Sequence, residues 1–326
     1  MMLAVLAVLA GFALMIWSAD RFVTGAAAMS LHAGMPSLLI GMVIVGFGTS
    51  APEMVISAIA ALDGNPGLAL GNALGSNIVN TGLILGITAL VAPITVHSKI
   101  VRRELPLLLA ISIFLGLLLW NNALSRAESL VLLAGFFTLI GWTVYSALQS
   151  RDDTLSAEVE QELKAHALSF GWAIFWLVAG LLLLLVSSRI LVWGAVSIAR
   201  ALEVSDLVIG LTIVALGTSV PELASSVAAV RKGEHDIAIG NVVGSNMFNL
   251  LAVVGIAGSI SPMPGIPAEV FTRDWPVMMA MMLMLFAMVW GWRGSGGRIG
   301  RPGGMLLLLA FAAYNVYLVL TVTATL

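Results

Sequence analysis

The sequence predicts an all-α membrane protein with ten transmembrane helices in two inverted repeats of five. Three observations support this prediction: a strongly apolar composition, a succession of span-length apolar stretches, and an internal duplication. Of the 326 residues 60% are apolar and 10% are charged, against about 25% charged in a soluble domain, and the mean hydropathy is +1.05. The lipid bilayer is therefore the expected surrounding of most of the chain.

Apolar stretches near the roughly 20 residues that cross a bilayer follow one another along the chain. Hydropathy and helix breakers predict ten spans, at 2–28, 36–61, 68–92, 104–120, 126–148, 170–200, 205–230, 237–261, 274–292 and 304–325. The first stretch lacks the basic n-region and the cleavage site of a signal peptide, so we expect it to be a span.

The duplication appears when the chain is shifted by 169 residues. Residues 40–93 then align without a gap with 209–262, and 22 of the 54 positions are identical. Because each half has five spans, an odd number, the second half must enter the membrane in the opposite sense, as in many transporters. We therefore expect a first repeat at 1–148, a polar linker at 149–169 and an inverted second repeat at 170–326.

Lys and Arg residues predict the orientation, because cytoplasmic connections are enriched in them. One side of the predicted membrane collects ten: Lys99, Arg102, Arg103, Arg151, Lys164, Arg231, Lys232, Arg293, Arg298 and Arg301. The other side collects three: Arg126, Arg200 and Arg273. This division predicts a cytoplasmic 149–169 linker and both termini outside.

Two acidic residues, Glu53 and Glu222, are predicted to lie deep inside spans, and they occupy equivalent repeat positions. A carboxylate in mid-membrane costs about 2.5–3.5 kcal/mol even on lenient scales, so a bound cation is the expected compensation. The alternative is a pair of structural acids, protonated or bonded to neighbouring helices. No Lys or Arg deep in a span is placed to pair with both, which favours the cation.

Oxygen-bearing side chains accompany each glutamate. Thr49 precedes Glu53 by one helical turn, as Thr218 precedes Glu222. A proline directly before each glutamate is expected to break the helix and so free backbone carbonyls. Polar residues recur every fourth position in the next span of each half: Asn72, Ser76 and Asn80, then Asn241, Ser245 and Asn249. Oxygen ligands without nitrogen or sulfur favour hard cations such as Ca²⁺ and Na⁺ over Zn²⁺ or Cu²⁺.

Several features carry a plainer interpretation. Gly71-x-x-x-Gly75, and the same motif at 240–244, suit close helix packing, and this role is compatible with a neighbouring ion site. Asn77 and Asn246 are as well suited to bonds between helices as to ion binding. A net charge of −2 argues against nucleic acid as a partner, since that needs a concentrated basic face, and the absence of Cys excludes thiolate metal sites.

The paired GTSAPE and GTSVPE motifs, each with the serine of GSN placed 23 residues after its glutamate, resemble the two α-repeats of the sodium/calcium exchanger family. The short linker resembles that of the prokaryotic members. The resemblance implies ten ion-coordinating residues: Thr49, Ser50, Glu53, Ser76, Asn80, Thr218, Ser219, Glu222, Ser245 and Asn249. Backbone carbonyls near Gly46 and Ala215 are further candidates.

The resemblance also implies the function. We expect an antiporter of the prokaryotic inner membrane that exchanges Ca²⁺ for Na⁺ by alternating access, without an enzymatic activity or a cofactor. Family members often carry Asp at one of the positions of Asn80 and Asn249, so coupling to H⁺ or K⁺ remains an alternative here. A cation channel is a weaker alternative, because nothing resembles a symmetric selectivity filter.

Overall fold

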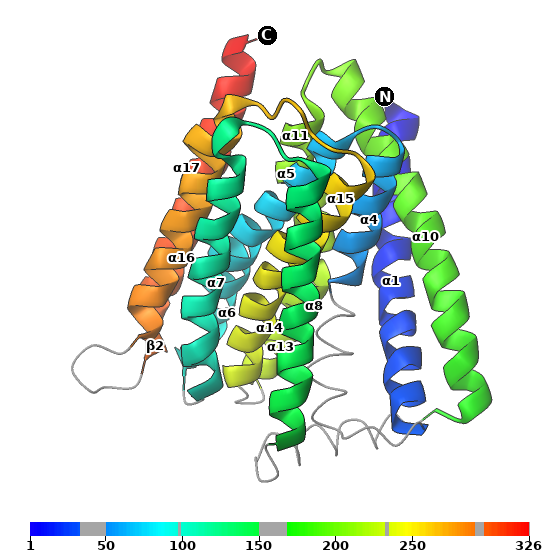
Figure 1. Cartoon of the computed structure of the whole chain (residues 1–326), viewed down its shortest axis with the longest axis vertical. Helices are drawn as coiled ribbons and strands as arrows, with labels where there is room; N and C mark the ends of the chain where they lie inside the picture. The colour runs from blue at the N-terminus through cyan, green and yellow to red at the C-terminus, as the bar shows by residue number, and fades with distance from the viewer. Residues whose placement is uncertain (33–49, 97–98, 150–167, 232–234, 291–296, 326) are drawn as a thin grey trace.

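A computed structural model describes residues 1–32, 50–96, 99–149, 168–231, 235–290 and 297–325. Figure 1 shows a bundle of helices aligned roughly along one axis, with the two chain ends at the same end of the bundle. Among the described residues, nine helical segments are long and apolar enough to cross a membrane. A tenth, the shorter apolar helix Ala51–Leu62, is the described part of the predicted span 36–61. The all-α membrane fold is thus confirmed.

The described helices match the predicted spans to within a few residues. The first half contains α1 (Met2–His32), α4 (Ala51–Leu62), α5 (Pro66–Ile78), η2 (Val79–Ile84), α6 (Leu85–Val91), α7 (Lys99–Leu118), η3 (Leu119–Asn121) and α8 (Arg126–Gln149). The second half contains α10 (Phe170–Ala201), α11 (Asp206–Ile209), η4 (Gly210–Val214), α12 (Ala215–Thr218), α13 (Val220–Arg231), α14 (His235–Phe248), η5 (Asn249–Val253), α15 (Val254–Ile260), η6 (Val270–Asp274), α16 (Trp275–Val289) and α17 (Arg301–Thr325). Most of the predicted 149–169 linker lies outside the described residues.

Two helical hairpins form the centre of the bundle and are inverted relative to each other. The turn between α4 and α5 lies at the upper end in Figure 1, whereas α13 and α14 approach each other at the lower end. The α4–α5 hairpin contacts the second half across the centre, since α5 packs against η4 and η5. The inversion required by five spans per half is therefore present in the fold.

Helices α1 and α10 form a separate antiparallel pair on one side of the bundle (Figure 1, right). Arg189, which lies within the long α10, forms an ion pair with Asp63, the residue that caps α4. Arg21, in α1, lies over the rings of Trp17 and Trp176, at 5.8 and 5.2 Å from their centroids. The pair is thus anchored to the core near the end of the α4–α5 hairpin.

Small residues allow the α4–α5 hairpin of the first half to pack closely against the second half. A Cβ atom added to Gly71 would lie 2.2 Å from the carbonyl oxygen of Leu207, and one added to Gly75 would lie 2.6 Å from that of Leu211. The packing role predicted for this motif is therefore confirmed. For the second motif, at 240–244, the repeat-equivalent neighbours fall within 33–49, outside the described residues.

Short β-strands tie two connections together, which the sequence analysis did not predict. β1 (Ile94–Thr95) pairs antiparallel with β2 (Arg298–Ile299), and Val96 N–H donates to the Gly297 carbonyl at 2.9 Å. The pairing joins the end of α6 to the start of α17. Strands of two residues carry no periodic signal in sequence.

Asp274, which the sequence places at a span end, is fully buried between η6 and α17. Arg273 donates to its two carboxylate oxygens at 2.6 and 3.1 Å, and the Tyr314 hydroxyl donates at 2.9 Å. Tyr314→Phe should lower the free energy of unfolding by about 1–3 kcal/mol, because a buried carboxylate loses a donor. Tyr317→Phe, on the same helix but 54% exposed, is the control and should change thermal unfolding little. Equal effects of the two substitutions would refute the bonding role.

Candidate cation site

The helices that carry the two glutamates begin in the same way in both halves. Ser50, before α4, has φ −88° and ψ 1°, and Ser219, between α12 and α13, has φ −85° and ψ 5°. This bridge conformation is sparsely populated and recurs at functional sites. Pro52 and Pro221 follow as the second residue of each helix, where the missing N–H costs the helix nothing.

Glu53 and Glu222 lie in the first turns of α4 and α13, with exposed fractions of 1% and 0%. The N-terminal end of a helix favours a negative charge, so each break supports the carboxylate that follows it. The two groups are close enough for their charges to repel. Both carboxyl oxygens of Glu53 accept no hydrogen bond of normal geometry from the described residues, although the Thr218 hydroxyl lies close by.

A repeated amide contact attaches each break to the next helix. Asn72 Nδ2 donates to the Glu53 carbonyl at 3.5 Å and to Ser57 Oγ at 3.1 Å. In the second half Asn241 Nδ2 donates to the Glu222 carbonyl at 3.4 Å, and also to Ser226 Oγ at 3.2 Å. Both asparagines belong to the polar pattern at every fourth residue, but they were not among the predicted ligands. In the structure they bond to the backbone that carries the glutamates. Ser57 and Ser226 are identical in the repeat alignment, and this identity could have indicated the contact from the sequence.

Hydroxyl groups from the two halves meet between the breaks. Ser50 Oγ donates to Ser245 Oγ at 3.1 Å, and Ser245 Oγ donates to Glu222 Oε1 at 3.3 Å. The Thr218 hydroxyl donates to Asn72 Oδ1 at 3.2 Å and lies 3.4 Å from Ser76 Oγ. The structure thus brings residues from far apart in the sequence into one buried oxygen-rich cluster.

The third and eighth predicted spans each change to π-helical geometry at the cluster. Asn80 lies in η2 and Asn249 begins η5, at equivalent repeat positions. Asn80 Nδ2 donates to Asn246 Oδ1 at 3.1 Å, and Asn249 Nδ2 donates to Asn77 Oδ1 at 3.2 Å. Single π-turns inside α-helices are frequent at functional sites.

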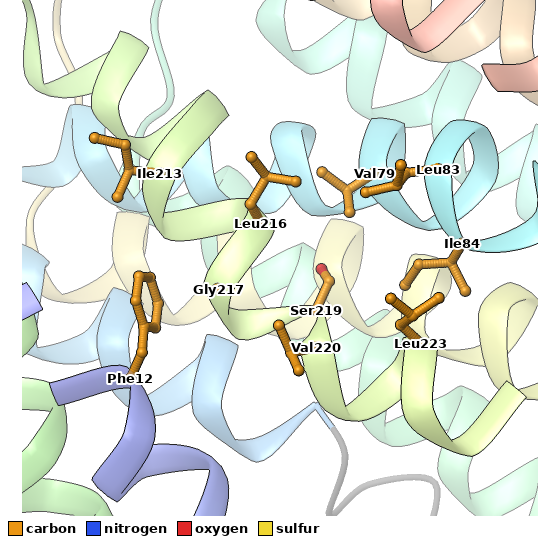
Figure 2. A pocket seen from close by; sticks show the side chains of 10 residues that line it. All are labelled: Phe12, Val79, Leu83, Ile84, Ile213, Leu216, Gly217, Ser219, Val220 and Leu223. Atoms are coloured by element: carbon orange, nitrogen blue, oxygen red, sulfur yellow. The ribbon is translucent and has the colours of Figure 1, made fainter. Parts of the chain in front are cut away.

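A cavity of about 430 Å³ lies next to the second break, as Figure 2 shows. Its wall includes Phe12 of α1, Leu83 of η2 and Leu223 of α13, and Ser219 supplies the hydroxyl seen in Figure 2. A Cβ atom on Gly217 would lie 1.7 Å from the Phe12 ring. The glycine therefore lets α1 approach the broken helix closely.

Comparison with known proteins decides the family. A model described as "Sodium/calcium exchanger protein" matches residues 3–145 and 172–320, most of both halves. The chain belongs to the sodium/calcium exchanger family. It is accordingly a multi-pass membrane transporter that exchanges Ca²⁺ and other cations, and it is not an enzyme.

Relatives of the exchanger are similar over nearly their whole length. The chain is 46% identical over 319 residues to CaxA of Alkalimonas amylolytica, named as a candidate antiporter, covering 98% of this chain and 99% of CaxA. It is 40% identical over 320 residues to the inner membrane protein YrbG of Escherichia coli, with 96% of each covered. A solved structure of the sodium-calcium exchanger NCX_Mj superposes with a TM-score of 0.66 at 31% identity, covering 97% and 98% of the two chains.

Nine of the ten predicted ion-coordinating residues of the exchanger fall within the described residues, and Thr49, like Gly46, lies outside them. All nine are buried: Ser50, Glu53, Ser76, Asn80, Thr218, Ser219, Glu222, Ser245 and Asn249. Clusters of three or more His, Cys, Asp or Glu side chains are absent from the described part of the chain. The available ligands are therefore hydroxyls, amides, carbonyls and two carboxylates, a set suited to hard cations.

Proposed function

We propose that this exchanger moves Ca²⁺ across the membrane in exchange for Na⁺ by alternating access. The observation that supports the proposal most is the pair of buried carboxylates, Glu53 and Glu222, each in the first turn of its helix, with the Ser245 hydroxyl donating to Glu222. Two carboxylates balance one divalent cation or two monovalent ones. We assign Ca²⁺ and Na⁺ to overlapping positions formed by the ten residues that the sequence predicts, Thr49 included.

The charge of this site explains why exchange is obligatory. With one Ca²⁺ or two Na⁺ bound, the two carboxylates are neutralised, and the site can re-orient within the low-dielectric centre of the bundle. Without a cation, two negative charges would have to move through the same environment, which is strongly unfavourable. A cation must therefore return for each cation that leaves.

Flux measurements on purified protein in liposomes test the coupling ion. We expect an outward-directed Na⁺ gradient to drive uptake of ⁴⁵Ca²⁺, with saturation and with Na⁺ counterflow. Uptake driven equally by a pH gradient without Na⁺, or by K⁺, would replace the proposed coupling by the H⁺ or K⁺ alternative. The H⁺ and K⁺ measurements are included because Asn80 and Asn249 are both uncharged, whereas family members often carry Asp at one of these positions.

The proposed orientation places both termini outside and the 149–169 linker in the cytoplasm. It is supported by the ten Lys and Arg residues assigned to one side against three on the other. We further propose that 1–148 and 170–326 act as the two repeats, with the linker as a passive connector. The likeness to YrbG, named an inner membrane protein, supports an inner-membrane location.

Labelling of a single Cys at Asp153 tests the orientation. The chain has no natural Cys, so a membrane-impermeant maleimide should leave Asp153→Cys unlabelled in intact cells and label it after permeabilisation. Asp63→Cys is unsuitable as the matching control because Asp63 pairs with Arg189, so Asn121→Cys, in the exposed α7–α8 connection, serves instead. Asn121→Cys should be labelled from outside. The reverse pattern would overturn the orientation.

A further inference from the structure

The amides of Asn80 and Asn249 are held by an exchange of hydrogen bonds between the two repeats. Asn80 donates to Asn246, and Asn249 donates to Asn77, at 3.1 and 3.2 Å. Under the 169-residue shift Asn80 corresponds to Asn249 and Asn77 to Asn246, so the two contacts are repeat equivalents. In each repeat the two asparagines are three positions apart and share a helix face.

The accepting asparagines are themselves fixed in direction. Asn246 Nδ2 donates to Thr81 Oγ1 at 3.0 Å, which turns its Oδ1 toward Asn80. Asn77 Nδ2 points to the sulfur of Met278 at 3.6 Å, which turns its Oδ1 toward Asn249. An amide carries one oxygen and one NH₂ group, so fixing the acceptor also determines which end of the donating amide is used.

The consequence is a pair of free carbonyl oxygens. Asn80 Oδ1 and Asn249 Oδ1 are buried and have no hydrogen-bond partner among the described residues, and the two asparagines are 0% and 1% exposed. A buried oxygen without a donor is unfavourable unless something positive binds it. A rotated amide would instead present NH₂ groups to the cation.

We propose that Asn77 and Asn246 are positioning residues: each accepts the NH₂ group of the opposite repeat's asparagine and so commits the Asn80 and Asn249 carbonyl oxygens to the transported cation. This inference rests on the proposed Ca²⁺ function and deepens it. It lets two neutral amides present oxygen to the cation, so that the site needs no third carboxylate. It also makes the orientation of each ligand depend on the other repeat.

A double-substitution experiment tests the positioning role in the full-length protein in detergent. The readout is the Ca²⁺ concentration that gives half of the maximal thermal stabilisation, which does not depend on the coupling ion. Asn246→Leu keeps the number and branching of the side-chain heavy atoms but cannot accept, so the Asn80 amide is free to rotate. We expect this concentration to rise at least about tenfold, the equivalent of one charge-assisted bond.

The same substitution is then made in the Asn80→Asp protein. A carboxylate accepts at both oxygens, so it presents an oxygen to the cation in either orientation. In the Asn80→Asp protein, adding Asn246→Leu should therefore change the Ca²⁺ concentration less than about twofold. The mirror pair, Asn77→Leu alone and with Asn249→Asp, repeats the test should the first pair fold poorly. Thr88→Val, which removes a buried hydroxyl of α6 without a partner among the described residues, is the control and should have no effect.

The outcomes separate the two proposals. Equal weakening of Ca²⁺ binding by Asn246→Leu in both backgrounds would show a structural role and overturn the positioning inference, as would no weakening in either. Stabilisation of the unsubstituted protein by Na⁺ but not by Ca²⁺ would overturn the proposed function itself. Weakening of Ca²⁺ binding by Asn246→Leu in the protein that keeps Asn80, but not in the Asn80→Asp protein, supports both the positioning role and the proposed function.

Discussion

Glu53→Gln and Glu222→Gln should each abolish Ca²⁺ flux and leave the protein folded. Two unit charges 4 Å apart interact by about 4 kcal/mol at an effective dielectric constant near 20, and a divalent ion doubles this. Losing one carboxylate should therefore weaken Ca²⁺ binding by at least about a thousandfold. Glutamine has nearly the same shape, so the packing of α4 and α13 should be kept.

Unfolding measurements distinguish loss of function from loss of fold in these variants. Without Ca²⁺ the glutamine variants should unfold at or above the wild-type temperature, because a buried carboxylate close to a second one is itself destabilising. Added Ca²⁺ should no longer raise that temperature. Glu269→Gln, an exposed position before η6, is the control and should retain flux. Substantial Na⁺-driven Ca²⁺ uptake by either folded site variant would end the paired-carboxylate proposal.

Gly71→Ala should strongly destabilise the bundle. The added methyl group would lie 2.2 Å from the Leu207 carbonyl oxygen and 3.0 Å from the Leu211 nitrogen, and backbone atoms of a packed helix cannot move aside cheaply. Overpacking of this kind costs about 1–3 kcal/mol or more. Because Asn72 follows directly, the resulting shift of α5 should also disturb the break at Glu53 and reduce flux.

Gly67→Ala is the matched control on the same helix. The nearest atom to its added methyl group would be the Leu207 nitrogen at 3.8 Å, an ordinary contact. Alanine also favours the helix by up to about 1 kcal/mol over glycine, so the unfolding temperature should stay constant or rise. Similar destabilisation by both substitutions would mean that helix contact at Gly71 is not the cause.

The sequence predicted the fold closely because membrane insertion leaves few alternatives. Backbone groups in lipid must bond within the chain, so long apolar stretches have to be helices, and nine described segments agree with the predicted spans. The duplication, with its odd number of spans per half, predicted the inversion seen in the hairpins α4–α5 and α13–α14. Short features without periodicity were missed: the β1–β2 pairing and the π-turns η2 and η5.

By itself the sequence determined which residues have the chemistry for a hard cation, since the cost of Glu53 and Glu222 in the membrane and their equivalence in the repeat can be read from one chain. Only the tertiary structure decided how they are used. The bonds from Ser50 to Ser245 and from Asn80 to Asn246 join side chains 195 and 166 positions apart. Spacing along a helix defines a face but not the partner it meets. Which amide oxygens remain free depends on contacts that exist only when the two inverted repeats pack together.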